Sequence, residues 1–214
     1  NRGHHCMVKP NAFKPPLLHN KQAIALGLST LHCWIRIFEF ILHLGYKMDT
    51  KRYQSRSPED KLSVNSRKKE IKRKFREELS LVVDTPKQGF GNTNTGNTAR
   101  RAFLAAESFS EITGVSLDII LRLRNILNAV CSGFHLNLDA FKAYCYKTSE
   151  LIVETYPWYI MPPTLHKVLE HGFLIAEHLD LPIGAYSEEA IRNPRLNHTC
   201  KISRINVMRN QFHY

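Results

Sequence analysis

The sequence predicts a mainly α-helical protein, because of its apolar periodicity, its helix-start signals and its lack of strand patterns. Apolar residues recur at steps of three and four along most of the chain, which is the helical period. Ser57-Pro58-Glu59-Asp60 combines a capping residue, a proline suited to the first helical position and two acids that favour the positive end of the helix dipole. No segment alternates apolar and polar residues over the length of a strand.

The first predicted helix runs from about Ala23 to Tyr46 and follows an irregular arm of residues 1–22, which contains three prolines. Arg36 alone would cost about 2.5–3.5 kcal/mol at mid-membrane depth, so we expect a buried helix and no membrane span. Four polar residues fall on one stripe of this helix. The stripe could face DNA or a partner, or it could be a solvated face with an Arg36–Glu39 ion pair. Its members are His32, Arg36, Glu39 and His43.

The second predicted helix starts at Ser57, runs to about Leu81 and is strongly basic. Between Arg67 and Arg76 it has seven Lys and Arg and one acid. Such a run is commonly a solvated face, and it also resembles a nuclear-import signal. In a chain with a net charge of +11 and a pI near 9.6, the run is also a candidate for contact with DNA phosphates. The predicted DNA-binding residues of this helix are Lys68, Lys69, Lys72, Arg73, Lys74 and Arg76.

The segment from Thr85 to Thr98 is rich in Pro, Gly, Asn and Thr and is predicted to be a loop. Its G-x-x-x-x-G-x-T spacing resembles a phosphate-binding loop. Asn97 stands where such a loop requires Lys, which excludes a nucleotide hydrolase. The backbone N–H groups of the loop, together with Arg100 and Arg101, can still bind a phosphate of DNA.

The remainder of the chain is predicted to be helical, with a turn rich in Pro and Gly before the last helix. The predicted elements are a short helix from near Thr98, helices over 117–132, 137–156 and 164–178, a turn at Pro182-Ile183-Gly184, and a helix that starts at Ser187 and ends before Pro194.

His166 and His171 are candidate metal ligands, because H-x4-H falls inside the spacing of structural zinc sites. Five residues turn about 140° around an ideal helix, so both rings reach one metal only at a helix end or with distortion. Two ordinary histidines are the alternative. Glu188 and Glu189 are candidate catalytic acids, although two acids in a first helical turn also stabilise a helix. The five cysteines contain no C-x-x-C pair, which fits reduced thiols better than a disulfide framework.

Six short segments occur in one order along the chain: Leu31-His32-Cys33, the basic helix, Asn97-Thr98-Ala99-Arg100, Tyr156-Pro157-Trp158-Tyr159, His166-x4-His171 and Ile183-Gly184-Ala185-Tyr186-Ser187-Glu188. This order resembles the C-terminal part of the Transib transposases and of the related catalytic subunit of the V(D)J recombinase. The resemblance covers about Gly27 to Asn193. It implies an RNase H-like DDE core that cuts and transfers DNA strands with two magnesium or manganese ions. It also implies a helical, zinc-binding insertion before the final acidic residue of that core.

The resemblance assigns zinc binding to the His pair. His166 and His171 match the family's histidine ligands, and the matching Cys pair would precede Leu31, where only Cys6 is present. Zinc is therefore an expected structural cofactor whose site is incomplete in this chain.

The resemblance also puts the catalytic residues in doubt. The family's two catalytic aspartates would precede the matched region, and its final Glu follows the Ser-Glu dipeptide by a few positions. Ile191 or Arg192 stands there in this chain, and an Arg would repel both metal ions. Glu188 or Glu189 could substitute only from about one helical turn away.

We predict four regions: the irregular arm (1–22), a helical zinc-binding insertion (23–182), the terminal helix of an RNase H-like core (183–194) and a basic tail (195–214), with the strands of the core upstream of this chain. We expect the chain to bind DNA in the nucleus and not to cut DNA on its own. The full-length form is expected to be a homodimer. The alternative function is a non-enzymatic, domesticated transposon remnant that acts as a DNA- or protein-interaction module.

Overall fold

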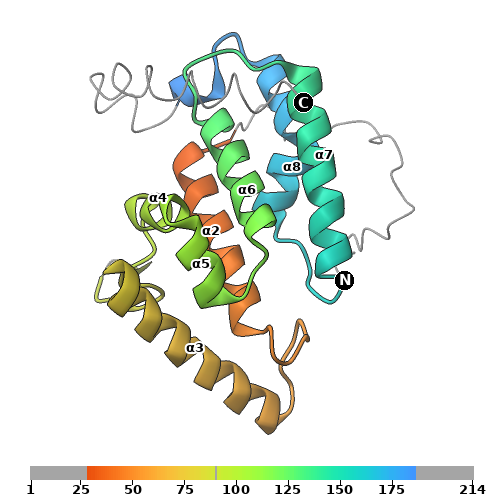
Figure 1. The fold of residues 1–214 in the computed structure, drawn as a ribbon. Helices are drawn as coiled ribbons and strands as arrows, with labels where there is room; N and C mark the ends of the chain where they lie inside the picture. Colours follow the sequence, from red (N-terminus) through yellow and green to blue (C-terminus); the bar gives the residue numbers. More distant parts are fainter. Residues whose placement is uncertain (1–27, 90, 187–214) are drawn as a thin grey trace.

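A computed structural model describes residues 28–89 and 91–186, and within these residues the protein is mainly helical (Figure 1). The helices are α2 (Thr30–Tyr46), α3 (Pro58–Leu79), α4 (Gly96–Leu104), α5 (Ala106–Thr113), α6 (Leu117–Val130), α7 (Leu138–Thr155) and α8 (Pro163–His178), followed by the 3-10 helix η1 (Ile183–Tyr186). The strands β1 (Pro86–Lys87) and β2 (Gly91–Asn92), each of two residues, pair as an antiparallel hairpin. The predicted α class is thus confirmed. The predicted arm, the tail and the candidate acids Glu188 and Glu189 lie outside the described residues.

Helix α2 is the centre of the fold, where it contacts α3, α4, α5, α6 and α8. Eleven of its 17 residues are buried, because apolar side chains surround most of the helix rather than one face. Phe38 packs on Phe75 of α3 and on Phe109 of α5, with ring centroids 6.2 and 5.6 Å apart. These edge-on and tilted contacts join three helices in one apolar core.

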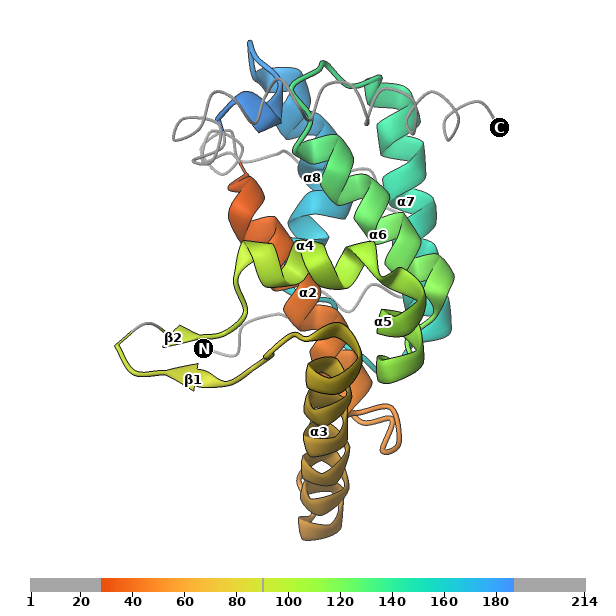
Figure 2. The same ribbon diagram turned by 60° about the vertical axis from the view of Figure 1, so that its left-hand side comes forward.

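Helix α3 lies at the edge of the molecule, and its N-terminal end projects beyond the other helices (Figures 1 and 2). The predicted start is confirmed: the Ser57 hydroxyl accepts a hydrogen bond from the Asp60 N–H at 3.0 Å, and Pro58 begins the helix. The helix ends at Leu79, two residues before the predicted end, because Ser80 takes the left-handed conformation with φ 52°. Only Ile71 and Phe75 are buried among its 22 residues.

Two predictions about the limits of elements are wrong. Helix α2 begins at Thr30 rather than near Ala23, because Ser29 caps it. The segment 85–98 is not all loop, since it contains the hairpin and the first residues of α4. Helix α4 starts at Gly96 because the Thr95 hydroxyl accepts from the Thr98 N–H at 3.2 Å.

The predicted turn at Pro182-Ile183-Gly184 is the start of η1, which packs closely on the end of α6. A Cβ on Gly184 would lie 2.3 Å from the Ser132 carbonyl oxygen and 2.5 Å from that of Cys131. Glycine is therefore needed here for the close approach of two backbones. In the part of the chain that the structure describes, no helix is both long and apolar enough to cross a membrane.

Candidate nucleic-acid interface and histidine pair

Several cations of the basic helix α3 are held by the protein itself. Lys68 forms an ion pair with Asp84, and the Lys72 ammonium donates to the Asp84 carbonyl oxygen at 3.0 Å. The Lys68 ammonium also lies 5.2 Å from the centre of the Tyr46 ring. These two predicted DNA-binding residues thus hold the start of the hairpin segment against α3.

Arg67, which belongs to the same basic run, joins α3 to two other helices. Its guanidinium donates to the carbonyl oxygens of Gly45 and Thr113 at 2.6 and 3.1 Å and to the Asp49 carboxylate at 2.7 Å. Gly45 lies near the end of α2, and Thr113 ends α5. Arg67 therefore has a structural position and was not among the predicted DNA-binding residues.

Arg73 is exposed, but two acids on its own helix surround it. It forms ion pairs with Glu70, at 2.6 Å, and with Glu77. The hydrogen bond from Arg73 lowers the pKa of the Glu70 carboxyl below its usual value. The charge of Arg73 is therefore balanced locally by two carboxylates of its own helix.

Lys69, Lys74 and Arg76 form a different group. Lys69 and Arg76 are exposed and Lys74 is half-buried. Within residues 28–89 and 91–186, the structure shows no hydrogen bond or ion pair for these three side chains. They are the cations of the basic run that remain open to an external anion.

The two arginines after the predicted loop lie against the protein. The Arg100 guanidinium is 5.3 Å from the centre of the Trp34 ring. Arg101 donates to the Leu79 carbonyl oxygen at 3.4 Å, which links α4 to the end of α3. Both were predicted to bind DNA together with the loop before them.

The polar side chains of that loop make internal contacts. The Asn94 carbonyl oxygen Oδ1 accepts from the Asp84 N–H at 2.7 Å, and the amide groups of Asn92 and Asn94 lie 3.4 and 3.3 Å from Glu39. Glu39 also pairs with Arg36 at 2.9 Å. Of the two alternatives for the polar stripe of α2, the Arg36–Glu39 pair is confirmed, and the stripe has the added role of anchoring the hairpin.

His166, in the first turns of α8, and His171, near the middle of α8, have their rings in contact. Their ring centroids are 5.3 Å apart and the ring planes are almost perpendicular, at 87°. The two rings are thus in contact, although an ideal helix would place positions five residues apart about 140° from one another. Among the described residues no group of three or more His, Cys, Asp and Glu is arranged to hold a metal. A structural zinc needs four ligands, of which this pair could supply at most two.

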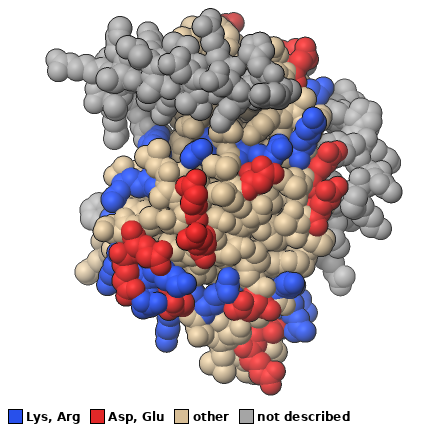
Figure 3. Space-filling model, viewed as in Figure 1, with Lys and Arg blue, Asp and Glu red and all other residues tan. Residues whose placement is uncertain are grey.

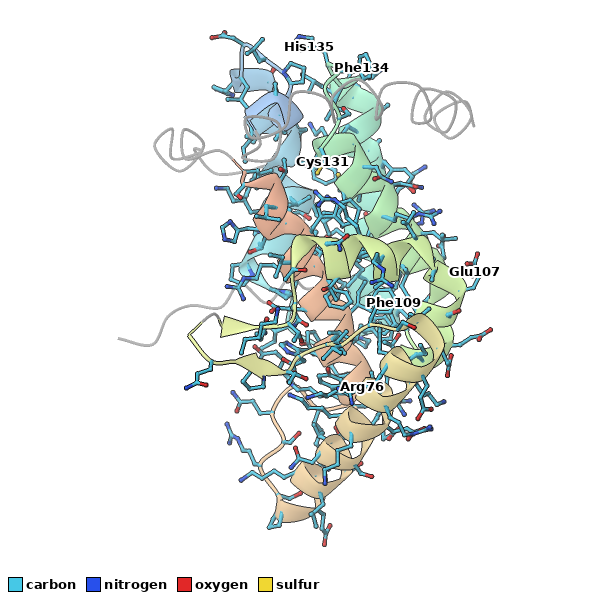
Figure 4. The ribbon with its side chains drawn as sticks, turned by 90° about the vertical axis from the view of Figure 1, so that its left-hand side faces the viewer. Arg76, Glu107, Phe109, Cys131, Phe134 and His135 are labelled. Atoms are coloured by element: carbon cyan, nitrogen blue, oxygen red, sulfur yellow. The ribbon has the colours of Figure 1, made fainter. Side chains whose placement is uncertain are left out.

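A shallow pocket of about 180 Å³ lies at the other end of the molecule, between the α6–α7 loop, α8 and η1. Figure 4 shows Phe134 and His135, two of its lining residues, at the end opposite α3. Glu177 and Ile183 also line it. None of the predicted site residues does, and no sequence motif pointed to it.

Most of the net positive charge of the chain lies outside the described residues. Residues 1–27 and 187–214 hold nine Lys and Arg and two Asp and Glu, so they carry +7 of the net +11. On the face in Figure 3, Lys and Arg are interspersed with Asp and Glu. Any binding of an anion by the described residues therefore depends on the local arrangement of their cations rather than on a large net charge.

No family model matches the chain, and no curated protein matches it.

Proposed function

We propose that this chain is a DNA-binding, non-catalytic C-terminal region of a Transib-like transposase or recombinase. The observation that supports DNA binding best is the group of open cations on α3, a helix that projects from the molecule (Figure 2). Exposed amines and guanidiniums gain from the release of counterions when they meet phosphates. The +7 charge of the chain ends adds to the same attraction.

In this proposal the helices α2 to α8 are the zinc-binding insertion of an RNase H-like core. The 5.3 Å separation of the His166 and His171 ring centroids supports this part, because two ligands of one ion must lie close together. Zinc would fix the start of α8 relative to two further ligands, and Cys6 is the one cysteine ahead of α2.

In the same proposal the chain does not cut DNA on its own. The position of the family's final Glu carries Ile191 or Arg192, and an Arg disfavours a pair of magnesium or manganese ions. Glu188 and Glu189 are the acids that stand nearest in sequence. The strand-transfer chemistry and the homodimer belong to the full-length family, whereas the chain itself acts in the nucleus in this proposal.

The test is a binding and nicking experiment with the full 214-residue chain and a supercoiled plasmid. We expect a mobility shift that salt abolishes and no nicked product with magnesium or manganese. Nicking that survives replacement of both Glu188 and Glu189 by Gln would contradict the assigned chemistry. Absence of binding at low salt would remove the DNA-binding function.

Zinc binding is tested separately by metal analysis of the purified chain. We expect His166→Ala to lower bound zinc, because it removes one of two adjacent ligands. His178→Ala is the matched control, since His178 lies at the other end of α8 and its Nδ1 is 2.8 Å from the Leu174 carbonyl oxygen. Equal zinc content in the two variants would contradict the assignment.

The alternative function is a non-enzymatic, domesticated transposon remnant that acts as a DNA- or protein-interaction module, and one observation favours its protein-binding form. The pocket between α6, α8 and η1 favours it, because part of its lining is apolar and Phe134 is 43% exposed. A chain that binds no DNA but recovers a defined protein partner through this pocket would favour the alternative.

A further inference from the structure

Most of the exposed charges of α3 lie on two flanks of the helix, one basic and one acidic, which the composition of the helix does not reveal. One flank contains Lys61, Asn65, Lys69 and Arg76, at steps of four, four and seven residues. Residues at these steps lie above one another on a helix, and all four side chains are exposed. We refer to these four residues as the Lys61–Arg76 stripe.

The other flank is acidic. Glu59, Glu70 and Glu77 follow one another at steps of 11 and seven residues, which again fall on one line of the helix. Arg73 lies between the two flanks and turns to the acidic side, where it pairs with Glu70 and Glu77. The third side of the helix faces the core through Ile71 and Phe75.

We infer that the Lys61–Arg76 stripe is a binding face for the phosphate backbones of duplex DNA, an inference that rests on the proposed function. The stripe is positive along its length, and no acid of α3 stands within it. Lys61 and Lys69 start about 12 Å apart along the helix axis, and Lys69 and Arg76 about 10 Å. The major groove of a duplex is about 12 Å wide, so a rigid helix can place successive cations at phosphates on its two sides.

Asn65 fits the same face. Its side-chain amide lies between Lys61 and Lys69 and can donate to a phosphate oxygen without adding charge. Lys68 and Lys72, by contrast, would have to leave Asp84 before they could bind an anion. The stripe therefore contains two residues that were not predicted to bind DNA, Lys61 and Asn65. It leaves out four residues of α3 that were predicted to do so: Lys68, Lys72, Arg73 and Lys74.

The experiment measures the affinity of the full chain for a 20-base-pair duplex by fluorescence anisotropy. Lys61→Gln, Lys69→Gln and Arg76→Gln each remove one charge and preserve helix propensity. We expect each to weaken binding roughly fivefold to tenfold at about 0.1 M salt, the amount expected for one lost phosphate contact. Lys147→Gln is the matched control, because Lys147 is an exposed lysine of α7 that lies away from α3, and it should weaken binding less than twofold.

Two outcomes separate this inference from the function on which it rests. If the unmodified chain does not bind the duplex, the DNA-binding function itself fails. If it binds but Lys147→Gln costs as much as Lys69→Gln, DNA binding stands and the stripe is wrong. A circular dichroism spectrum of each variant checks that α3 remains helical.

The nature of the partner is tested with two competitors of equal charge. A single strand and poly-glutamate lack the fixed spacing between two backbones, so each should compete at least tenfold less well than the duplex. Equal competition by the single strand would overturn the duplex assignment. Equal competition by poly-glutamate would show that the stripe binds an acidic protein as well as it binds duplex DNA.

Discussion

Helices α2 and α3 are neighbours of similar length that differ in almost every physical property. Eleven of the 17 residues of α2 are buried, against two of the 22 residues of α3. Helix α2 therefore decides whether the chain folds, whereas most side chains of α3 are free of packing constraints and can serve binding. The comparison separates residues that stabilise the fold from residues that recognise a partner.

The largest expected effect is the loss of an aromatic ring from α2. Phe38→Ala removes contacts with Phe75 and Phe109 in the core. It should lower the free energy of unfolding by about 3–5 kcal/mol, measured by urea denaturation. Leu62→Ala on α3 is the control, because Leu62 is 70% exposed. The Leu62→Ala variant should unfold at an almost unchanged urea concentration. Similar losses in both variants would mean that α3 is packed as α2 is.

The next effect concerns the link between the two helices. Arg67→Ala leaves the carbonyl oxygens of Gly45 and Thr113 without their donor and should lower the free energy of unfolding by about 2 kcal/mol. Arg73→Ala on the same helix should leave the unfolding midpoint unchanged, because the pairs of Arg73 are fully exposed to water. An equal loss from both would show that position on α3, rather than internal contact, decides stability.

The smallest effect is at the start of α3. Ser57→Ala removes the hydroxyl that caps the Asp60 N–H and should cost about 1 kcal/mol, with faster hydrogen exchange in the first turn. Ser66→Ala in the exposed middle of α3 is the control and should be neutral or slightly stabilising. A midpoint unaffected by Ser57→Ala would show that the first turn adds nothing to global stability.

Local signals predicted the helices well. The Ser57 start of α3 and the helices over 117–132, 137–156 and 164–178 agree with α3, α6, α7 and α8 to within two residues at most of their ends. Capping residues and prolines act within one turn, so the sequence alone reveals them. The hairpin was missed because it has only two residues in each strand, too few for alternation to show.

The state of each cation could not be predicted from the sequence. Arg67 donates a hydrogen bond to Thr113, which is 46 residues away in the sequence, and the fold brings Lys68 into an ion pair with Asp84. Until these partners are known, every Lys and Arg of the basic run is an equal candidate for binding DNA. The separation of charges on α3 could have been predicted from the sequence, because the steps that place Lys61 in line with Lys69 and Arg76 are present there.

The most direct test is the salt dependence of duplex binding by the intact chain and by the triple variant Lys61→Gln/Lys69→Gln/Arg76→Gln. Each phosphate contact contributes about 0.9 to the slope of log K against log salt concentration. We predict that the triple variant has a slope smaller in magnitude by about 2.7, with an unchanged urea midpoint. An equal slope in the two proteins would contradict the division between a stabilising α2 and a DNA-binding α3.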